Sequence, residues 1–404
     1  MKILILQDDF PPYEHGGAGV IAGLAARGFA AAGHEVFVIT TVQKRELEGI
    51  FSENGMKIFR IFSDYHVRWR SYRSLHNRAI TPQIKKIIDE IKPDAVHAHN
   101  IHYHISYYAL KLARKHTDKV FLTTHDIMSF YQGTFTEFIN KKDLSCPKAF
   151  DYRVNQLMLF RAFKKRHNPF HNFFVRGYLK NVKKIVTVSN ALQDALSQNN
   201  IRNTTVIYNG IDVENWNVAR QDPEGKEFIL FGGRLSGAKG GDLMLQALAI
   251  VAAKRSQARL LIFGKKDAYS DRILARAKEL GVEDRIVMVG WQGEEALKKH
   301  YNLSSLAVVP SVCFDSFPTV NLQAFASNKP VIATCFGGSR ELVHDGENGF
   351  IVNPYNVKTL AEKILYLLEN PEKAKEFGEN GYRLVAEKHN LKAMVEKYLS
   401  LFSE

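Results

Sequence analysis

Two cations stand five residues apart in a glycine-rich stretch that directly follows the apolar run Phe228–Phe231. They are Arg234 and Lys239, and glycines, among them Gly233, lie on both sides of them. An arginine fork and a lysine point charge on such a loop could bind a diphosphate together, because glycine lets the backbone approach an anion closely. The spacing is not that of a Walker A loop, and the alternative interpretation is a surface turn with two solvated cations.

A second segment with possible chemistry follows the apolar run Leu306–Val309 and contains a predicted helix start near Pro318. Proline is favoured at the first position of a helix, and the backbone amides at a helix N-terminus favour an anion. Asp315 precedes this helix and Gln323 falls on its second turn. Both side chains could therefore face one ligand, one near each end. The alternative is an ordinary capped helix start.

Near the N-terminus, Gly16 and Gly17 lie between a first apolar run, Lys2–Leu6, and a helical pattern over Val20–Ala32. Glycines between a strand and a helix let backbone amides approach an anion. The stretch also satisfies a loose dinucleotide-binding pattern, but nine residues separate the strand from these glycines. No acid follows the second predicted strand to bind a ribose. We therefore expect either an anion-binding turn or a turn without a ligand.

Histidines gather in one predicted strand and the loop after it, and the group consists of His97, His99, His102 and His104. A metal site is not expected there, because no acid or cysteine joins these histidines at ligand spacing. His125 closes another predicted strand, Val120–Thr124, and Asp126 follows it. A histidine at a strand end could hydrogen-bond a substrate or shuttle a proton, and the alternative is a structural histidine.

Both halves of the chain alternate short apolar runs with helical patterns, which predicts parallel sheets covered by helices on both faces. We therefore predict an α/β protein with two doubly wound, Rossmann-like domains that face each other across a cleft. The predicted parts are a first domain over 1–205, a second over 206–385, and a final helix, 386–404, that packs back on the first. The stretch 130–150 lacks periodicity, and a loop of that length in a compact domain is usually functional or mobile.

The composition is that of an ordinary globular protein, since 45% of the 404 residues are hydrophobic and 24% are charged. No apolar run approaches the roughly 18 residues that a membrane span needs. The first residues do not form a signal-peptide pattern. The three cysteines are widely spaced and include no CxxC pair. They predict neither a disulfide framework nor a metal cluster, and they favour a reducing, cytoplasmic setting.

The net charge of +13 lies almost wholly in the first half of the chain, where 29 Lys+Arg face 17 Asp+Glu in residues 1–200. Residues 201–404 hold 26 against 25. The excess is greatest from Arg161 to Lys184, where phenylalanines are interleaved with the cations. This stretch could lie against an anionic membrane, or its aromatic side chains could pack inward. No nucleic-acid-binding signature is present, and we expect no such partner.

Seven segments, in order along the chain, resemble the GT-B glycosyltransferases, specifically the retaining family 4, also called glycosyl transferases group 1. The segments are Pro11–Gly17, Pro93–Asn100, Thr124–Asp126, Val188–Asn190, Val206–Asp212, Gly233–Gly240 and Pro310–Thr334. The resemblance implies transfer of a hexose-type sugar from a UDP- or GDP-sugar, with retention at the anomeric carbon and without a metal or another cofactor. It implies a saccharide or lipid-linked saccharide acceptor in cell-surface polysaccharide or glycolipid synthesis, in the cytoplasm or at the inner face of the membrane.

The resemblance also implies roles for single residues. His125 would contact the transferring sugar, while Arg234 and Lys239 would neutralise the leaving diphosphate. Asp315 takes the place of the first of the family's two spaced glutamates, near the sugar. We expect donor binding by Gly16, Gly17, Gly233, Gly264, Trp291, Ser316, Phe317, Pro318, Thr319, Val320 and Gln323. We expect acceptor binding by His15, His99 and Asn100.

Two positions depart from the family's pattern. Asp315 is one methylene shorter than glutamate, and Gln323 stands where the second glutamate normally binds the ribose hydroxyls. A carboxylate accepts from both hydroxyls, whereas an amide accepts with one atom and donates with the other. Losing a charge-assisted bond costs about 1–2 kcal/mol, or about tenfold in affinity. The alternative function is therefore a non-catalytic relative that binds a nucleotide sugar or a glycan.

Overall fold

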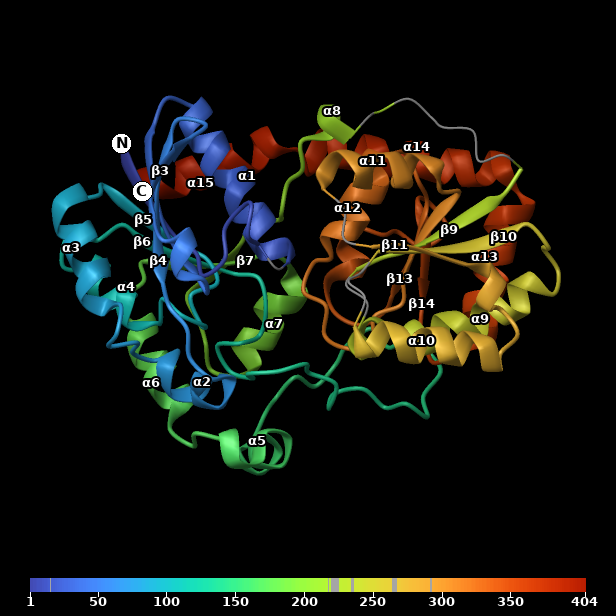
Figure 1. The fold of residues 1–404 in the computed structure, drawn as a ribbon, viewed down its shortest axis with the longest axis horizontal. Helices are drawn as coiled ribbons and strands as arrows, with labels where there is room; N and C mark the ends of the chain where they lie inside the picture. The colour runs from blue at the N-terminus through green and yellow to red at the C-terminus, as the bar shows by residue number, and fades with distance from the viewer. Residues whose placement is uncertain (15, 217, 219–224, 234–235, 264–266, 291–292) are drawn as a thin grey trace. The chain divides into compact units, whose positions relative to one another are not determined.

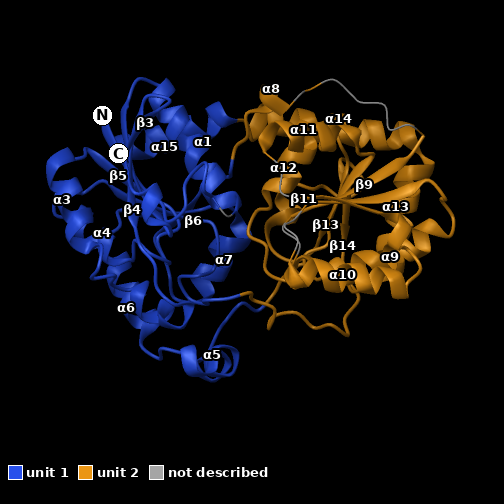
Figure 2. Ribbon diagram, in the orientation of Figure 1, with its two compact units in different colours: residues 1–133, 151–209, 391–404 blue, residues 134–150, 210–390 orange. Residues whose placement is uncertain are grey.

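The structure is a computed structural model of the 404-residue chain, and it describes all residues except 15, 217, 219–224, 234–235, 264–266 and 291–292. The chain divides into two compact units (Figure 2). Unit 1 comprises residues 1–133, 151–209 and 391–404, and unit 2 comprises residues 134–150 and 210–390. Each unit is a parallel-sheet α/β structure of the Rossmann type (Figure 1), so the prediction of two such units is confirmed.

Unit 1 is built on an eight-stranded sheet of order β3-β4-β2-β1-β5-β6-β7-β8, in which the β3–β4 pair alone is antiparallel. The strands are β1 (Lys2–Leu6), β2 (Glu35–Val42), β3 (Gly49–Glu53), β4 (Met56–Phe62), β5 (Ala95–Ala98), β6 (Val120–Thr124), β7 (Lys184–Thr187) and β8 (Thr204–Val206). The central strand β1 is fully buried from Ile3 to Leu6. Its continuous apolar run is typical of a parallel strand with both faces covered.

The helices of unit 1 cover this sheet and carry its connections. They are α1 (Gly17–Ala31), α2 (Arg70–Arg73), α3 (Thr81–Ile91), α4 (Tyr108–Ala113), α5 (Gln156–Phe163), α6 (His171–Leu179), α7 (Asn190–Gln198) and α15 (Leu391–Ser403). The C-terminal helix α15 packs on α1 so closely that a Cβ on Gly28 would lie 2.3 Å from Cγ2 of Val395. Tyr398 and Phe402 of α15 are fully buried in the core of unit 1.

Unit 2 is built on a six-stranded, wholly parallel sheet of order β11-β10-β9-β12-β13-β14. The strands are β9 (Glu227–Phe231), β10 (Ala258–Phe263), β11 (Ile286–Gly290), β12 (Leu306–Val309), β13 (Val331–Thr334) and β14 (Gly349–Val352). The helices are α8 (Val213–Trp216), α9 (Gly241–Ala252), α10 (Ala268–Glu279), α11 (Glu294–Leu303), α12 (Thr319–Ala326), α13 (Val357–Glu369) and α14 (Pro371–Lys388). Buried aliphatic side chains from α9 and α13 pack with those of the strands in one core.

The long loop between β6 and α5 leaves unit 1 and returns to it. Residues 134–150 belong to unit 2 (Figure 2), where the amide of Phe314 donates to the carbonyl of Phe135 at 2.9 Å. The side chain of Asn353 donates to the carbonyls of Asp143 and Ser145 at 2.8 and 2.7 Å. Most of the aperiodic stretch 130–150 predicted from the sequence therefore belongs to unit 2, to which these hydrogen bonds attach it.

The unit boundaries lie near the predicted divisions and differ from them in detail. Unit 2 begins at Gly210 rather than 206, and the final helix of unit 1 begins at Leu391 rather than 386. Among the residues that the structure describes, no helix is long and apolar enough to cross a lipid bilayer.

Candidate active site

Two histidines lie together at the carboxyl ends of two neighbouring parallel strands in unit 1. His99 directly follows β5, and His125 directly follows β6. The Nδ1 atom of His99 is 2.9 Å from Nε2 of His125, and the two rings are stacked with 12° between their planes. Because parallel strands end at the same edge of a sheet, this edge is where ligands bind in open α/β folds.

A series of buried contacts beneath the strand ends, within the core of unit 1, supports the His99–His125 pair. His97 lies within β5, and its Nε2 atom is 2.8 Å from the hydroxyl of Thr123 on β6. That hydroxyl is 3.1 Å from the hydroxyl of Tyr398 on the C-terminal helix. The His97 ring also lies between its neighbours, 4.1 Å from the ring of His99 and 4.6 Å from that of Tyr398. Helix α15 therefore holds the strand ends that carry the histidines.

The histidines of this edge are neutral at physiological pH. Burial lowers the pKa of His125 to about 4 and that of His97 to about 3. It also holds the pKa of His99 well below its usual range. Charging an imidazole in a desolvated site is unfavourable, which explains the direction of each shift. In the His99–His125 pair one neutral ring donates and the other accepts, so the site is suited to hydrogen bonding rather than to charge.

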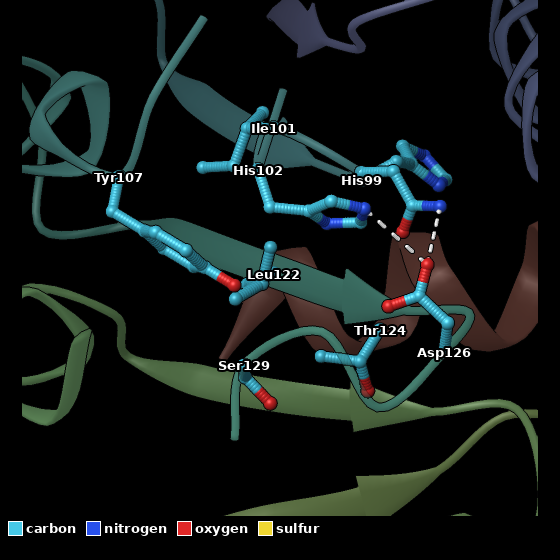
Figure 3. Close-up of a pocket in the computed structure, with 9 residues that line it drawn as sticks. His99, Ile101, His102, Tyr107, Leu122, Thr124, Asp126 and Ser129 are labelled. Carbon is cyan, nitrogen blue, oxygen red and sulfur yellow. Dashed lines mark hydrogen bonds and ion pairs between the residues drawn. The ribbon is translucent and has the colours of Figure 1, made fainter. Parts of the chain in front are cut away.

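A small pocket with mixed polar and apolar walls adjoins the pair, and the side chains that line it are drawn in Figure 3. Its lining includes His99, Asn100, His102, Asp126 and Ser129. Asp126 accepts a hydrogen bond from the Asn100 amide at 3.0 Å and lies 3.4 Å from Nε2 of His102. Nε2 of His99 and the hydroxyl of Ser129 are buried without a hydrogen-bond partner in the described structure. Buried polar atoms of this kind are usually satisfied by water or by a ligand.

Asp8 is a residue of this edge that the sequence reasoning missed. It follows β1 and is buried, and its carboxylate accepts from the amides of Tyr103, His104 and Ile105 at 2.6 to 2.8 Å. It thereby holds the loop that follows His99. Burial outweighs these three hydrogen bonds and raises the pKa of Asp8 to about 7. The available signal was an acid placed two residues after a buried parallel strand.

In unit 2, the glycine-rich loop after β9 meets the loop after β12. Lys239 forms an ion pair with Asp315, and the hydroxyl of Ser311 donates to the same carboxylate oxygen at 2.8 Å. Both side chains are largely buried, with 23% of Lys239 and 13% of Asp315 exposed. The amide of Val312 donates to the carbonyl of Ala238 at 2.9 Å, which ties the two loops together. The structure therefore joins two residues that the sequence assigned to one site from separate motifs.

Glycines permit this close approach of backbones. Gly240 has φ +76°, and a Cβ there would lie 2.1 Å from the carbonyl oxygen of Pro310. Gly337 has φ +87°, and a Cβ there would lie 2.1 Å from the carbonyl oxygen of Asp315. Gly233 has φ +106° and lies against the aliphatic stem of Lys239. Only glycine fits the first two positions without moving the backbone that carries Asp315.

The sequence predicted Pro318 at the first position of a helix. Helix α12 instead begins at Thr319, so Pro318 immediately precedes the helix. No side chain caps this N-terminus, and Ser316, Phe317 and Pro318 are buried in the loop before it. The first-turn amides of α12, those of Thr319 and Val320 among them, therefore have no capping side chain. An uncapped helix start of this kind is suited to an anion.

Gln323 lies on the second turn of α12 and is half-buried. Its side-chain oxygen accepts a hydrogen bond from the hydroxyl of Tyr301 at 3.0 Å. Tyr301 is fully buried and packs edge-on against Trp216, with ring centroids 5.4 Å apart. One of the two lone pairs of the Gln323 oxygen is therefore used by the protein, which leaves the second lone pair and the amide NH2 for any ligand.

The remaining predicted residues divide between the start of α1 and positions outside the described residues. Gly17 begins α1 and Gly16 precedes it in open space, with no side chain capping the helix. Four predicted site residues lie outside the described residues: His15, Arg234, Gly264 and Trp291. Among the described residues, no three side chains of the metal-ligating types are placed to hold a metal ion.

Comparison with known proteins agrees with this arrangement. Residues 212–384 match the family Glycosyl transferases group 1, and residues 15–215 match Glycosyltransferase Family 4. The chain belongs to family 4 of the GT-B glycosyltransferases. This glycosyltransferase is 26% identical over 383 residues to an uncharacterised glycosyltransferase of Methanocaldococcus jannaschii, covering 89% of the present chain and 87% of the relative.

Solved structures show the same fold. Sucrose-phosphate synthase from Thermosynechococcus elongatus superposes with a TM-score of 0.80 at 19% identity, covering 100% of this chain and 98% of that one. HepE from Anabaena, solved with UDP and glucose, superposes with a TM-score of 0.73 at 18% identity, covering 100% and 99%. At these identities the likeness concerns the fold, and the roles of single residues in this glycosyltransferase are argued from its own geometry.

Proposed function

We propose that this glycosyltransferase moves a hexose-type sugar from a UDP- or GDP-sugar to a saccharide or lipid-linked saccharide, with retention at the anomeric carbon. The observation that carries the proposal is the Lys239–Asp315 ion pair, which joins the glycine-rich loop after β9 to the loop that leads into the uncapped start of α12. Of the two nucleotides, the complex of HepE with UDP and glucose supports UDP as the one carried by the donor. The proposed setting is the cytoplasm, either in solution or at the inner face of the membrane, in cell-surface polysaccharide or glycolipid synthesis.

In this proposal the diphosphate is bound by unit 2. Lys239 and Arg234 neutralise the negative charge that develops on the leaving diphosphate, and the amides at the start of α12 bind its oxygens. Preorganised donors at the position of developing charge are usually the largest catalytic contribution. Asp315 lies next to the transferring sugar and keeps Lys239 in place before the donor arrives. These groups perform the task without a metal ion.

The residues of unit 1 contact the sugars. His125 hydrogen-bonds a hydroxyl of the transferring sugar as a neutral imidazole, and Gly16 and Gly17 lie against the donor. Acceptor binding is assigned to His15, His99 and Asn100. An oxygen of the leaving phosphate takes the proton of the acceptor hydroxyl on the same face of the sugar. Retention then follows without a covalent enzyme intermediate.

The first test is the shift of the thermal unfolding midpoint with UDP, GDP, ADP and NAD, each at ~1 mM. A ligand at about 100 times its dissociation constant adds about 2.7 kcal/mol to the free energy of unfolding. In a protein of this size each kcal/mol raises the midpoint by roughly 2–4 °C. A shift with UDP or GDP alone supports the proposal and identifies the donor class. No shift with any of the four contradicts nucleotide binding.

The second test compares donor turnover in Lys239→Ala, Arg234→Ala and the matched variant Lys254→Ala, which removes an exposed lysine at the end of α9. Turnover falls by about 100-fold or more in the first two, since one preorganised donor at developing charge contributes about that factor. It stays unchanged in the third. Full turnover in both Lys239→Ala and Arg234→Ala would contradict the assignment of the diphosphate site.

Gln323 favours a second candidate, a protein that binds a nucleotide sugar or glycan without transferring the sugar. Because the Gln323 oxygen already accepts from Tyr301, one lone pair and the NH2 group remain for the ribose hydroxyls, and neither carries the charge of a carboxylate. Gln323→Glu tightens UDP binding by about tenfold if a ribose lies there, because a carboxylate accepts a charge-assisted bond. Measurable sugar transfer or slow donor hydrolysis by the unaltered protein rejects the binding-only candidate.

A further inference from the structure

Two helices of unit 1 carry large hydrophobic side chains that are exposed and therefore do not belong to a hydrophobic core. On α5 and α6 and the turn before α6 they are Leu157, Phe160, Phe170, Phe173 and Phe174, with exposed fractions between 48% and 67%. The sequence left open whether the aromatic residues between Arg161 and Lys184 pack inward, and the exposure of Phe170, Phe173 and Phe174 shows that these three do not. Contiguous exposed apolar surface on a folded protein usually marks a contact with a partner or a membrane.

Helix α6 is firmly attached by its opposite face, so the exposure is not a loose end of the chain. His171, Val175 and Leu179 follow one another at helical spacing and are buried. The Nε2 atom of His171 lies 3.2 Å from the hydroxyl of Ser74, and the Asn172 amide donates to the carbonyl of Phe130 at 2.9 Å. The phenylalanines therefore occupy the outer face of an anchored helix.

A third segment extends this surface. Val67, Trp69 and Tyr72, which lie in the short 3-10 helix η2 (Val67–Trp69) and in α2, are each about half exposed. The hydroxyl of Ser71 in α2 donates to the carbonyl of Arg166 at 2.8 Å, and the Asn168 amide donates to the carbonyl of Ser71 at 3.1 Å. The segment of α2 is thereby bonded to the turn that joins α5 to α6 (Figure 1). We call residues 67–73 and 156–180 the aromatic–basic surface.

The charge of this surface has one sign. Residues 65–88 and 152–193 contain no aspartate or glutamate. The exposed cations among them include Arg68, Arg161, Lys164, Lys165, Arg166 and Lys180. Exposed phenylalanine, tryptophan and leucine together with lysine and arginine form the pattern of segments that lie in a membrane interface. Each cation near an anionic leaflet adds electrostatic attraction to the apolar contact.

We propose that the aromatic–basic surface binds an anionic lipid bilayer, with the phenylalanines inserted at the headgroup level and the cations facing phosphate headgroups. A second copy of the chain fits this surface less well. A symmetric contact would set the same acid-free, basic segments of two copies against each other. The proposal goes beyond the proposed function, because lipid binding does not require sugar transfer.

The test is flotation of the full-length protein with vesicles of phosphatidylcholine alone and of phosphatidylcholine mixed with phosphatidylglycerol. We expect binding to the anionic vesicles, and weaker binding as salt rises. The triple variant Phe170→Ser, Phe173→Ser, Phe174→Ser lowers the partition coefficient by about 100-fold or more, because each inserted phenylalanine contributes about tenfold. The matched variant Ile250→Ser, Val287→Ser, Tyr366→Ser alters exposed hydrophobic residues of unit 2 and leaves the partition unchanged.

Charge reversal tests the electrostatic part of the proposed lipid binding independently. Lys164→Glu, Lys165→Glu, Lys180→Glu abolishes binding to anionic vesicles, whereas reversal of the exposed Lys86 and Lys115 elsewhere on unit 1 changes it by less than about threefold. Wild-type protein that stays unbound to anionic vesicles overturns the proposal, as does equal binding by the phenylalanine triple variant. Concentration-dependent dimerisation lost in that variant would assign the surface to a second copy instead. The UDP thermal shift, measured on the same samples, separates these results from the fate of the nucleotide site.

Discussion

The imidazoles of His99 and His125 are joined nitrogen to nitrogen at 2.9 Å, with their rings stacked 12° from parallel. Because both are neutral, this bond couples the tautomer of His125 to that of His99, and it leaves Nδ1 of His125 to contact a ligand. His99 is therefore a positioning residue for His125, in addition to its proposed place in acceptor binding.

The first prediction follows from that bond. His99→Phe keeps an aromatic ring in the stack but removes the nitrogen, and we expect kcat to fall by about tenfold, the equivalent of one hydrogen bond. His99→Asn places a side-chain amide near the former Nδ1 position and recovers part of kcat. The control His344→Phe changes an exposed histidine of unit 2 and leaves kcat unaltered. Equal loss in the asparagine and phenylalanine variants would show that the bond to His125 does not matter.

The second prediction concerns acid stability. Burial lowers the pKa of His102, His104, His125 and His171 to about 4 and that of His97 to about 3. Between the folded values and the ordinary value of 6.5, the unfolded chain binds more protons. The free energy of unfolding therefore falls as pH drops through this window, by up to about 1.4 kcal/mol per pH unit for each histidine.

Asp8 acts in the opposite direction. The folded pKa of Asp8, about 7, lies above the ordinary 3.8. Its contribution to the free energy of unfolding is therefore complete below pH 3.8 and is lost as pH rises toward 7. Five histidines outweigh one aspartate, and the thermal midpoint is expected to fall from pH 6.5 to pH 4.5. Unfolding scans across this range measure the effect. His171→Gln, which removes one titrating group, should flatten the dependence, and a midpoint that rises toward acid would contradict the prediction.

The alternation of apolar runs and helical patterns was sufficient to predict the two parallel-sheet units, because parallel strands are buried on both faces. The β3–β4 hairpin was not predicted. Its outer strand β3 lies at the sheet edge and is largely exposed, so it carries no apolar run. Strand β8 has three half-buried residues and gives no pattern at all.

The pairing of Lys239 with Asp315 and of His99 with His125 follows from one rule, that loops at the carboxyl ends of parallel strands meet. What the sequence could not predict are contacts between distant elements. Tyr398 reaches the hydroxyl of Thr123 across 275 residues of chain, and no local pattern indicates that these two residues contact each other. Asp8 was overlooked for a related reason, since its partners are backbone amides of another loop.

The third prediction concerns the Lys239–Asp315 ion pair. Asp315→Asn releases Lys239 from a carboxylate and removes a negative charge near the proposed diphosphate. We expect UDP to bind about fivefold more tightly, since an ion pair of this exposure contributes about 1 kcal/mol. Donor turnover falls by about 100-fold, because the charge next to the sugar is lost. Calorimetric titration with UDP and a turnover assay measure both, with Asp271→Asn on the exposed start of α10 as control. Weaker UDP binding in Asp315→Asn would indicate that the carboxylate itself supports the nucleotide.

The fourth prediction concerns Gly337, whose φ of +87° and position against the carbonyl of Asp315 exclude a side chain. The amide of Gly338 donates to that carbonyl at 2.9 Å, so the loop after β13 fixes the backbone of Asp315. Gly337→Ala must both adopt a strained φ and displace this contact, and we expect a loss of about 2–4 kcal/mol in the free energy of unfolding.

The matched variant Gly177→Ala lies within α6, where no atom comes within 4 Å of the added methyl group. Alanine is favoured over glycine in a helix, so this variant gains about 0.5–1 kcal/mol. Thermal unfolding compares the two, and UDP titration follows the site. Because Asp315 moves with the loop, Gly337→Ala should also change UDP affinity, whereas Gly177→Ala should not. A Gly337→Ala protein with unaltered stability and UDP affinity would mean that the loop after β13 can shift without moving Asp315.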